Sequence, residues 1–75
     1  MLYTRIAMPF DRLALARLRE RAVLTQKELA KRARISQISV HYIESGKQQP
    51  RPSTIRALAR ALGVRPSELM SVDEG

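Results

Sequence analysis

The chain has 75 residues, of which 44% are hydrophobic and 4% aromatic, and 14 Lys and Arg against 7 Asp and Glu give a formal net charge of +7. This length allows one small domain, whose core has to be built from Leu, Ile, Val and Ala side chains. The positive charge is typical of a nucleic-acid-binding protein, although a generally basic domain or a protein bound to an anionic membrane surface would also show it.

The absence of cysteine excludes disulfides, thiolate metal sites and a Cys nucleophile, and it fits a reducing compartment. No apolar run approaches the roughly 18 residues that a membrane span needs. The first ten residues also lack the long apolar core of a signal peptide. We therefore expect a cytoplasmic protein with no membrane partner, associated with the nucleoid if it binds DNA.

Residues 1–9 are predicted to form an arm in front of the domain. Leu2, Thr4, Ile6 and Met8 alternate on one side of this segment, which fits a short strand or an arm at a dimer interface. Such a leader is more often disordered. The domain itself is expected over residues 10–70, followed by a C-terminal tail over residues 71–75.

Three helix starts are marked by capping residues. Asp11 is placed to cap a helix over about residues 11–21, and Thr25 with Glu28 forms the capping box of a helix over about residues 25–33. Ser36 is placed to cap a third helix over about residues 36–45. Each side-chain oxygen would accept a hydrogen bond from a backbone N–H that has no partner within its helix.

Glycines and prolines define the remaining boundaries. Gly46 and Gly63 each follow a helical run and can adopt the left-handed backbone conformation that ends a helix. Pro52 can begin a fourth helix over about residues 52–62, and Pro66 a short fifth over about residues 66–70. The sequence therefore predicts an all-α fold of five helices.

The helix over residues 36–45 has an apolar side and an exposed side near its N-terminus. Val40 and Ile43 are expected to pack against the preceding helix, which leaves four side chains exposed: Gln37, Ile38, His41 and Tyr42. A recognition helix reads base edges from its N-terminal half. A Gln can make two hydrogen bonds to adenine, and an Ile can pack on a thymine methyl group.

These segments resemble, in order and spacing, the Cro and repressor type of helix-turn-helix protein, the xenobiotic-response-element family. The matching residues are 18–20 (Leu-Arg-Glu), 24–30 (Leu-Thr-Gln-Lys-Glu-Leu-Ala), 35–37 (Ile-Ser-Gln), 43–47 (Ile-Glu-Ser-Gly-Lys), 50 (Pro) and 58–64 (Leu-Ala-Arg-Ala-Leu-Gly-Val). The resemblance implies a compact five-helix bundle like the DNA-binding domain of phage repressors. It also implies a sequence-specific transcriptional regulator of double-stranded operator DNA, usually a homodimer, for which repression is the simplest mechanism.

The resemblance assigns roles to individual residues. Base contacts fall to Gln37, Ile38, His41 and Tyr42, while Gln26 contacts the DNA backbone and braces Gln37. The other contacts to the DNA backbone fall to Lys27, Lys47, Gln48, Gln49 and Arg51. The structural residues are a buried ion pair, Arg19 with Glu44, and the caps Thr25 and Ser36.

Two residues depart from the family pattern. Arg34 and Val23 stand where the family usually has glycine, in the turns after the second and the first helix. A residue with a side chain there has to tolerate a positive φ, at a cost of about 1 kcal/mol, or the turn has to differ.

The alternatives to a DNA-binding regulator are a protein-interaction module and an enzyme. An antitoxin or another protein-interaction module that also binds DNA would add a protein partner, such as a toxin or a polymerase. An enzyme is not expected, because one His and no Cys give no convincing nucleophile, base or metal cluster. We predict no cofactor and no metal, and we take Val64, Leu69, Met70 and residues 2–8 as candidates for a dimer interface.

Overall fold

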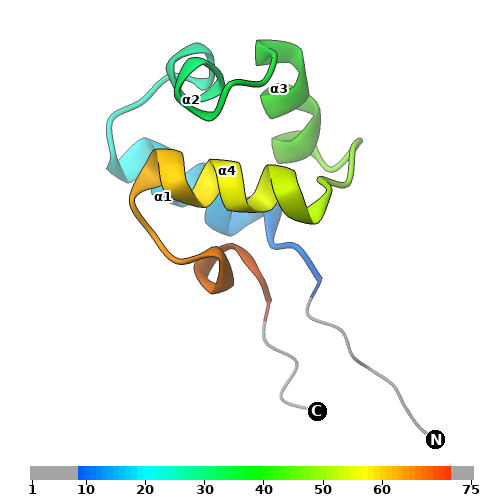
Figure 1. The fold of residues 1–75 in the computed structure, drawn as a ribbon. Coiled ribbons are helices and arrows are strands. Elements are labelled where there is room, and N and C mark those ends of the chain that lie inside the picture. Colours follow the sequence, from blue (N-terminus) through cyan, green and yellow to red (C-terminus); the bar gives the residue numbers. More distant parts are fainter. Residues whose placement is uncertain (1–8, 72–75) are drawn as a thin grey trace, which may run out of the picture.

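The computed structural model describes residues 9–71, which form four α-helices and one 3₁₀-helix (Figure 1). The α-helices are α1 (Arg12–Arg21), α2 (Gln26–Ala33), α3 (Gln37–Ser45) and α4 (Pro52–Leu62), and the 3₁₀-helix is η1 (Pro66–Leu69). The all-α class is confirmed over these residues, and α1 to α4 lie within one residue of their predicted bounds. The predicted count of five helices is not confirmed as five α-helices, because the fifth segment is the 3₁₀-helix η1.

The fifth segment ends at Leu69 because the next residue, Met70, pairs with another part of the chain. Met70 is extended, with φ −116° and ψ 144°, and it forms an isolated antiparallel bridge with Phe10. The bridge is closed by hydrogen bonds from the Asp11 amide to the Leu69 carbonyl, at 2.8 Å, and from the Ser71 amide to the Pro9 carbonyl, at 2.7 Å. A backbone held in this bridge cannot continue a helix.

The predicted capping residues begin α1, α2 and α3. Asp11 accepts hydrogen bonds from the amides of Leu13 and Ala14, each at 3.1 Å. Thr25 and Glu28 form both halves of the capping box, at 3.0 and 2.8 Å. At the start of α3 the Ser36 hydroxyl accepts from the Ser39 amide at 3.1 Å.

All four α-helices end in the same left-handed turn. Gly46 and Gly63 have φ values of 84° and 71° after α3 and α4, while Val23 and Arg34 have φ values of 57° and 61° after α1 and α2. Each turn carries the pair of backbone hydrogen bonds that defines a Schellman motif. The two residues that replace glycine therefore keep the glycine-type turn.

The core is formed where the helices meet. α2 packs against α3 and α4, and η1 packs against α1 and α4. The largest fully buried side chains are Leu15, Leu29, Val40, Ile43, Leu58 and Leu69. Because Leu69 is buried in this core, its prediction as a dimer-interface residue is wrong.

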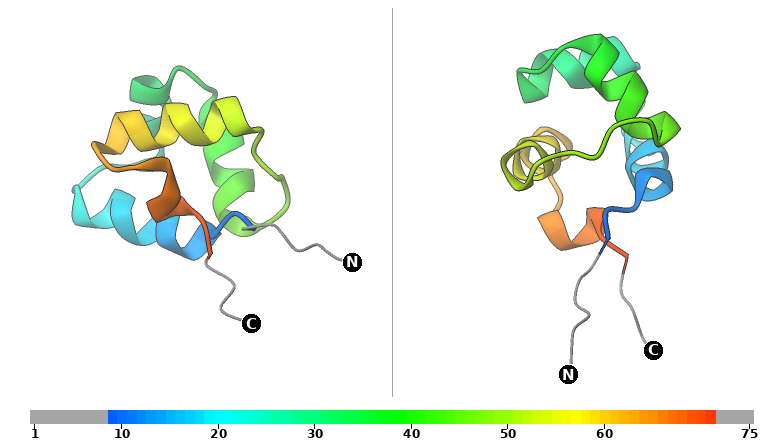
Figure 2. Two further views of the ribbon diagram at one scale, coloured as in Figure 1. Left: turned by 60° about the horizontal axis from the view of Figure 1, so that its bottom comes forward. Right: turned by 90° about the vertical axis from the view of Figure 1, so that its right-hand side faces the viewer.

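The paired segments around Phe10 and Met70 lie at the end of the molecule away from α2 and α3 (Figure 2). Residues 1–8 and 72–75, which include most of the predicted arm and tail, lie outside the described residues. The predicted domain bounds therefore stay predictions. No helix within residues 9–71 is long and apolar enough to cross a membrane.

Candidate nucleic-acid interface

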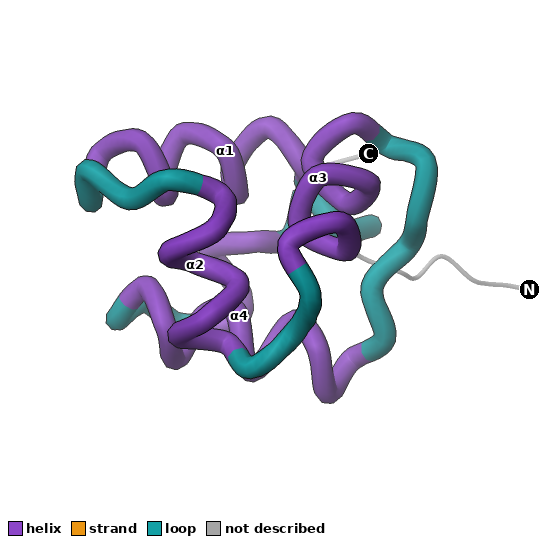
Figure 3. Tube along the Cα trace, turned by 90° about the horizontal axis from the view of Figure 1, so that it is seen from above, coloured by secondary structure: helices purple, strands orange, loops and turns teal. Residues whose placement is uncertain are grey.

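The turn between α2 and α3 holds the two helices at an angle to each other (Figure 3). Arg34 lies in its left-handed position, with φ 61° and ψ 42°. The Ile35 amide donates to the Ala30 carbonyl at 3.0 Å, and the Arg34 amide donates to the Lys31 carbonyl at 3.3 Å. These bonds close the end of α2 immediately before Ser36 begins α3, so the turn fixes the direction in which α3 leaves.

The N-terminal half of α3 separates buried from exposed side chains as predicted. Val40 is fully buried and Ile43 is 1% exposed, whereas Ile38 is 53% and Tyr42 40% exposed. Gln37 and His41 are exposed as well. An open hollow is lined by the side chains of Gln26, Gln37, Ile38 and His41. The structure thus brings two amides, an imidazole and an aliphatic side chain together on one face.

Tyr42 does not line this hollow but lies beside it. Its ring centroid is 5.8 Å from that of His41, and the Nζ atom of Lys47 is 6.0 Å from the Tyr42 ring centroid. The Lys47 amide donates to the Tyr42 carbonyl at 2.9 Å in the turn that Gly46 forms. The end of α3 therefore places a cation next to the tyrosine ring.

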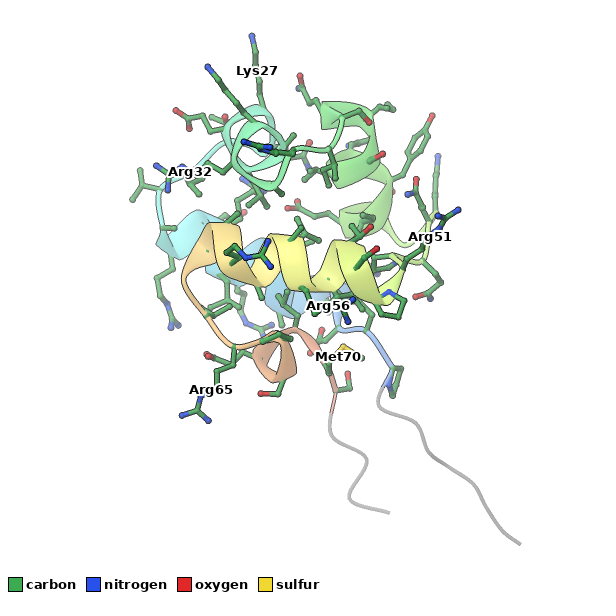
Figure 4. The ribbon with its side chains drawn as sticks, in the orientation of Figure 1. Lys27, Arg32, Arg51, Arg56, Arg65 and Met70 are labelled. Atoms are coloured by element: carbon green, nitrogen blue, oxygen red, sulfur yellow. The ribbon has the colours of Figure 1, made fainter. Side chains whose placement is uncertain are left out.

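Exposed polar and basic residues also lie on α2 and in the segment after α3. Gln48 and Gln49 are exposed in the loop after α3, as are the cations Lys27, Lys47 and Arg51. Figure 4 shows Lys27 on the outer side of α2 and Arg51 beside the loop that joins α3 to α4. Lys27 lies on α2, which contributes Gln26 to the hollow, and Lys47 and Arg51 lie in the segment between α3 and α4.

The predicted ion pair joins α1 to α3. Arg19 Nε lies 2.6 Å from Glu44 Oε2, and Arg19 Nη2 lies 3.0 Å from Glu44 Oε1. The exposed fractions of the two side chains are 14% and 8%. The hydrogen bond to Glu44 raises the pKa of Arg19 above its ordinary value, so the guanidinium stays charged at neutral pH. Such a pair sets geometry more surely than it adds stability.

Gln26 is held by the same carboxylate. Its Nε2 atom donates to Oε1 of Glu44 at 2.9 Å, so Glu44 connects α1, α2 and α3. In the structure this bond goes to Glu44 and not to Gln37, and the bracing of Gln37 by Gln26 stays a prediction.

A model of the family described as helix-turn-helix domain matches residues 13–71. The chain belongs to this family. No curated protein matches its sequence.

Solved structures similar to this helix-turn-helix domain include regulators and part of an enzyme. The restriction-modification controller protein C.AhdI from Aeromonas hydrophila is 31% identical, with a TM-score of 0.76 over 77% of this chain and 88% of that chain. The P22 c2 repressor in complex with a synthetic operator is 22% identical, with a TM-score of 0.76 over 83% of this chain and 94% of that one. A mutant of a hydroxyethylphosphonate dioxygenase is 26% identical with a TM-score of 0.73, and the similarity covers 91% of this chain but 14% of the enzyme.

Arg12, which was not among the predicted residues, supports the helix-turn-helix from α1. Arg12 Nη1 donates to the carbonyl of Glu44 at 3.0 Å. A Cβ atom on Gly46 would lie 3.1 Å from Arg12 Nε, so the arginine packs directly against the turn after α3. Arg12 and Arg19 are seven residues apart and hence on one side of α1. Because Arg19 was predicted to contact α3, the same spacing could have predicted that Arg12 contacts the end of α3.

Within residues 9–71, no group of three or more His, Cys, Asp or Glu side chains could hold a metal ion. His41 is the one histidine of the sequence, and it lies in the exposed hollow with two glutamines and an isoleucine. The chemistry that this face offers is therefore hydrogen bonding, apolar contact and positive charge.

Proposed function

We propose that this helix-turn-helix domain regulates transcription by binding double-stranded operator DNA in a sequence-specific way, with α3 in the major groove. The observation that carries the proposal is the hollow lined by Gln26, Gln37, Ile38 and His41. It lies on the exposed half of a helix whose opposite side is buried. The similarity to C.AhdI and to the operator-bound P22 c2 repressor supports this assignment.

The exposed residues are proposed to make two kinds of contact with DNA. Gln37, Ile38, His41 and Tyr42 are proposed to meet base edges, where hydrogen bonds and methyl contacts distinguish sequences. Contacts to the sugar–phosphate backbone, which position the protein without reading sequence, are proposed for Gln26, Lys27, Lys47, Gln48, Gln49 and Arg51.

Repression by a homodimer is the proposed mode of action. Two copies would place their α3 helices about 34 Å apart, one turn of DNA, and the bound dimer would block access by polymerase at the nucleoid. An apolar hollow away from α3 offers a surface for the second copy, and its lining residues are Pro52, Ile55, Arg56, Pro66, Ser67 and Met70. Arg65 and Met70 lie at the end of the molecule opposite Lys27 (Figure 4).

Selection of bound sequences from a random pool of DNA duplexes tests the function and the symmetry together. We expect one preferred sequence, arranged as two inverted half-sites if the protein is a dimer. Replacing Gln37 with Ala should relax the preference at one base pair of each half-site. Recovery of unselected sequence at moderate salt would refute the proposed function.

A protein-binding role, such as that of an antitoxin, is a second candidate because the apolar hollow of α4 and η1 would suit a different protein as well as a second copy. Purification of the protein from its host distinguishes the two roles. A stoichiometric protein partner favours the second candidate, and a homodimer without one favours the first. An enzymatic role gains no support from the dioxygenase, because 14% of that chain is matched.

A further inference from the structure

Arg12, the first residue of α1, holds the turn that follows α3. Its Nη1 atom donates to the Glu44 carbonyl at 3.0 Å, a bond between residues 32 positions apart. A Cβ atom on Gly46 would lie 3.1 Å from Nε and 3.2 Å from Cδ of Arg12, so the arginine side chain lies directly against the glycine. Arg19 binds the carboxylate of the same Glu44. Two arginines of α1 therefore meet the end of α3.

The contact supplies a positive charge that α3 itself lacks at its end. The last carbonyl groups of a helix have no partner within it and carry a partial negative charge. α1, α2 and α4 each have at least one basic residue in their last turn, whereas α3 has none. The guanidinium of Arg12 bonds one of the last carbonyls of α3. A cation at this place stabilises the end of α3 in the position that α1 sets.

The turn held by Arg12 leads directly into Lys47 and Gln48. The amides of both residues donate to the Tyr42 carbonyl, at 2.9 and 3.2 Å. Residues 42–48 therefore form one hydrogen-bonded unit, which is tied to α3 at Tyr42 and to α1 at Glu44. The contacts of Arg12 thus help to fix the backbone from which the Lys47 side chain extends.

We propose that Arg12 is a positioning residue for DNA binding, which holds Lys47 and Gln48 where they meet the sugar–phosphate backbone. In the complex its guanidinium stays on the Glu44 carbonyl, while Lys47 makes the phosphate contact. This role rests on the proposed function, in which Lys47 and Gln48 are backbone contacts. Because phosphate contacts carry no sequence information, loss of Arg12 should weaken binding to all sequences by a similar factor.

A direct contact of Arg12 with a phosphate is the alternative, because its side chain is exposed. The two roles differ in how replacements of Arg12 and Lys47 combine. Two separate phosphate contacts act independently, so the losses of binding free energy add. A residue that acts by positioning Lys47 loses most of its effect once Lys47 is replaced.

A double-mutant cycle with Arg12→Met and Lys47→Gln distinguishes the two roles. Methionine keeps an unbranched side chain but has no charge and no N–H group. Fluorescence anisotropy measures the affinity of the parent, both single variants and the double variant for the selected operator. We expect the loss caused by Lys47→Gln to be at least about threefold smaller in the Arg12→Met background than in the parent protein.

The salt dependence of binding gives a second measure of the same coupling. Each phosphate contact adds about −0.9 to the slope of log K against log salt concentration. Arg12→Met and Lys47→Gln should each make the slope shallower by about 0.9 per copy, and the double variant should do no more. Two direct contacts would instead make it shallower by about 1.8 in the double variant.

Arg17→Met is the matched control, because it removes the same charge from the same helix. Arg17 is exposed and follows Arg12 by five residues, so it lies on a different side of α1. Affinity and salt slope should be unchanged in this variant. Hydrogen exchange in the DNA-free protein measures the turn itself, and the amides of Lys47 and Gln48 should exchange faster in Arg12→Met but not in Arg17→Met.

Several results would overturn the role of Arg12. Losses that add in the double variant would make Arg12 a direct phosphate contact. Equal affinity of Arg12→Met and Arg17→Met, or unchanged exchange at Lys47 and Gln48, would show that Arg12 does not hold the turn. A changed base preference in Arg12→Met would place its effect on the reading face of α3. Each of these results refutes the role of Arg12 alone, whereas the absence of any preferred sequence for the parent protein refutes the proposed function as well.

Discussion

Val23 and Arg34 carry side chains in a backbone conformation that glycine adopts more easily. Val23 has φ 57° and is 85% exposed, so few contacts compensate for the strain of a β-branched residue there. Arg34 has φ 61° and is also exposed, but it lies in the turn that directs α3. The same strain therefore has different consequences at the two positions.

Val23→Gly should stabilise the protein. Relief of left-handed strain outweighs the extra freedom of glycine in the unfolded chain, for a net gain of about 0.5–1 kcal/mol. For a domain of this size we expect Tm to rise by a few degrees, at about 4–8 °C per kcal/mol. Thermal unfolding followed by circular dichroism measures this change. DNA affinity should stay the same, and a Tm at or below that of the parent protein would contradict the assignment of strain.

Residues whose roles depend on near neighbours were predictable from the sequence. Asp11, Thr25 and Ser36 were predicted as caps because their partners are two or three residues away. The partner of Gln26 was not predicted, since the bond to Glu44 joins residues 18 positions apart and depends on how α2 packs against α3. Side-chain position at the candidate site is thus a product of tertiary packing.

At the scale of the elements, α4 differs from the other α-helices in how it begins. Arg51 occupies its N-cap position with extended backbone, φ −72° and ψ 158°, but makes no capping hydrogen bond. Pro52 follows in the first turn, where it is well tolerated. The helix start therefore lacks the stabilisation that Ser, Thr or Asp provides in the others.

Arg51→Ser should change stability and DNA binding in opposite directions. A serine at this position can accept from the first turn of α4, for a gain of about 0.5–1 kcal/mol in the free energy of unfolding. Loss of a proposed phosphate contact should weaken binding to all DNA sequences by a similar factor. Urea denaturation and fluorescence anisotropy measure the two effects. Unchanged affinity would remove Arg51 from the interface.

The capping box of α2 predicts a dependence on acid. Hydrogen bonds from the Thr25 backbone amide and then from its side chain lower the pKa of Glu28 below its ordinary value. A lowered folded-state pKa adds stability that is present above the unfolded pKa of about 4.3 and is lost as pH falls through the folded value.

Glu28→Gln should reduce this acid dependence, because glutamine can also complete a capping box but does not titrate there. The difference in stability between the parent protein and the variant should shrink as pH falls below about 4.3. Urea denaturation of both proteins at a series of pH values measures this difference in the free energy of unfolding. A difference that stays constant down to acid pH would show that Glu28 makes no such contribution.

The boundaries of α1 to α4 could be predicted from capping residues, glycines and Pro52. The helix type and the end of η1 could not be predicted in this way. Residues 66–70 contain Pro66 at a helix start and Glu68 near it, signals that an α-helix and a 3₁₀-helix share. The distinction arises from Met70, whose pairing with Phe10 joins residues 60 positions apart. The sequence alone therefore could not show that this helix stops after one turn.

At the scale of the whole molecule, positive charge is spread widely but is not equally placed for DNA. Lys27 lies on α2, and Lys47 and Arg51 lie in the segment after α3, whereas Arg65 lies at the end of the molecule opposite Lys27 (Figure 4). A net charge of +7 raises attraction to any polyanion. The local arrangement decides which cations displace counterions from DNA.

Salt should weaken DNA binding with a slope set by these three cations. At about −0.9 per phosphate contact, the slope of log K against log salt concentration should be about −2.7 per bound copy. Lys47→Gln should make it shallower by about 0.9 per copy, and Arg65→Gln should leave it unchanged. Anisotropy titrations at several salt concentrations provide the slopes, and equal effects of the two variants would assign binding to net charge alone.

The antiparallel contact between Pro9 and Ser71 makes the domain suitable for backbone cyclisation. Their carbonyl oxygen and amide nitrogen are 2.7 Å apart. A short peptide linker in place of residues 1–8 and 72–75 could therefore join the two segments without distorting η1. A closed ring has fewer unfolded conformations, so it should resist heat better than the linear chain. The junction would lie at the end of the molecule away from α2 and α3 (Figure 2), leaving the proposed reading face of the circular protein open.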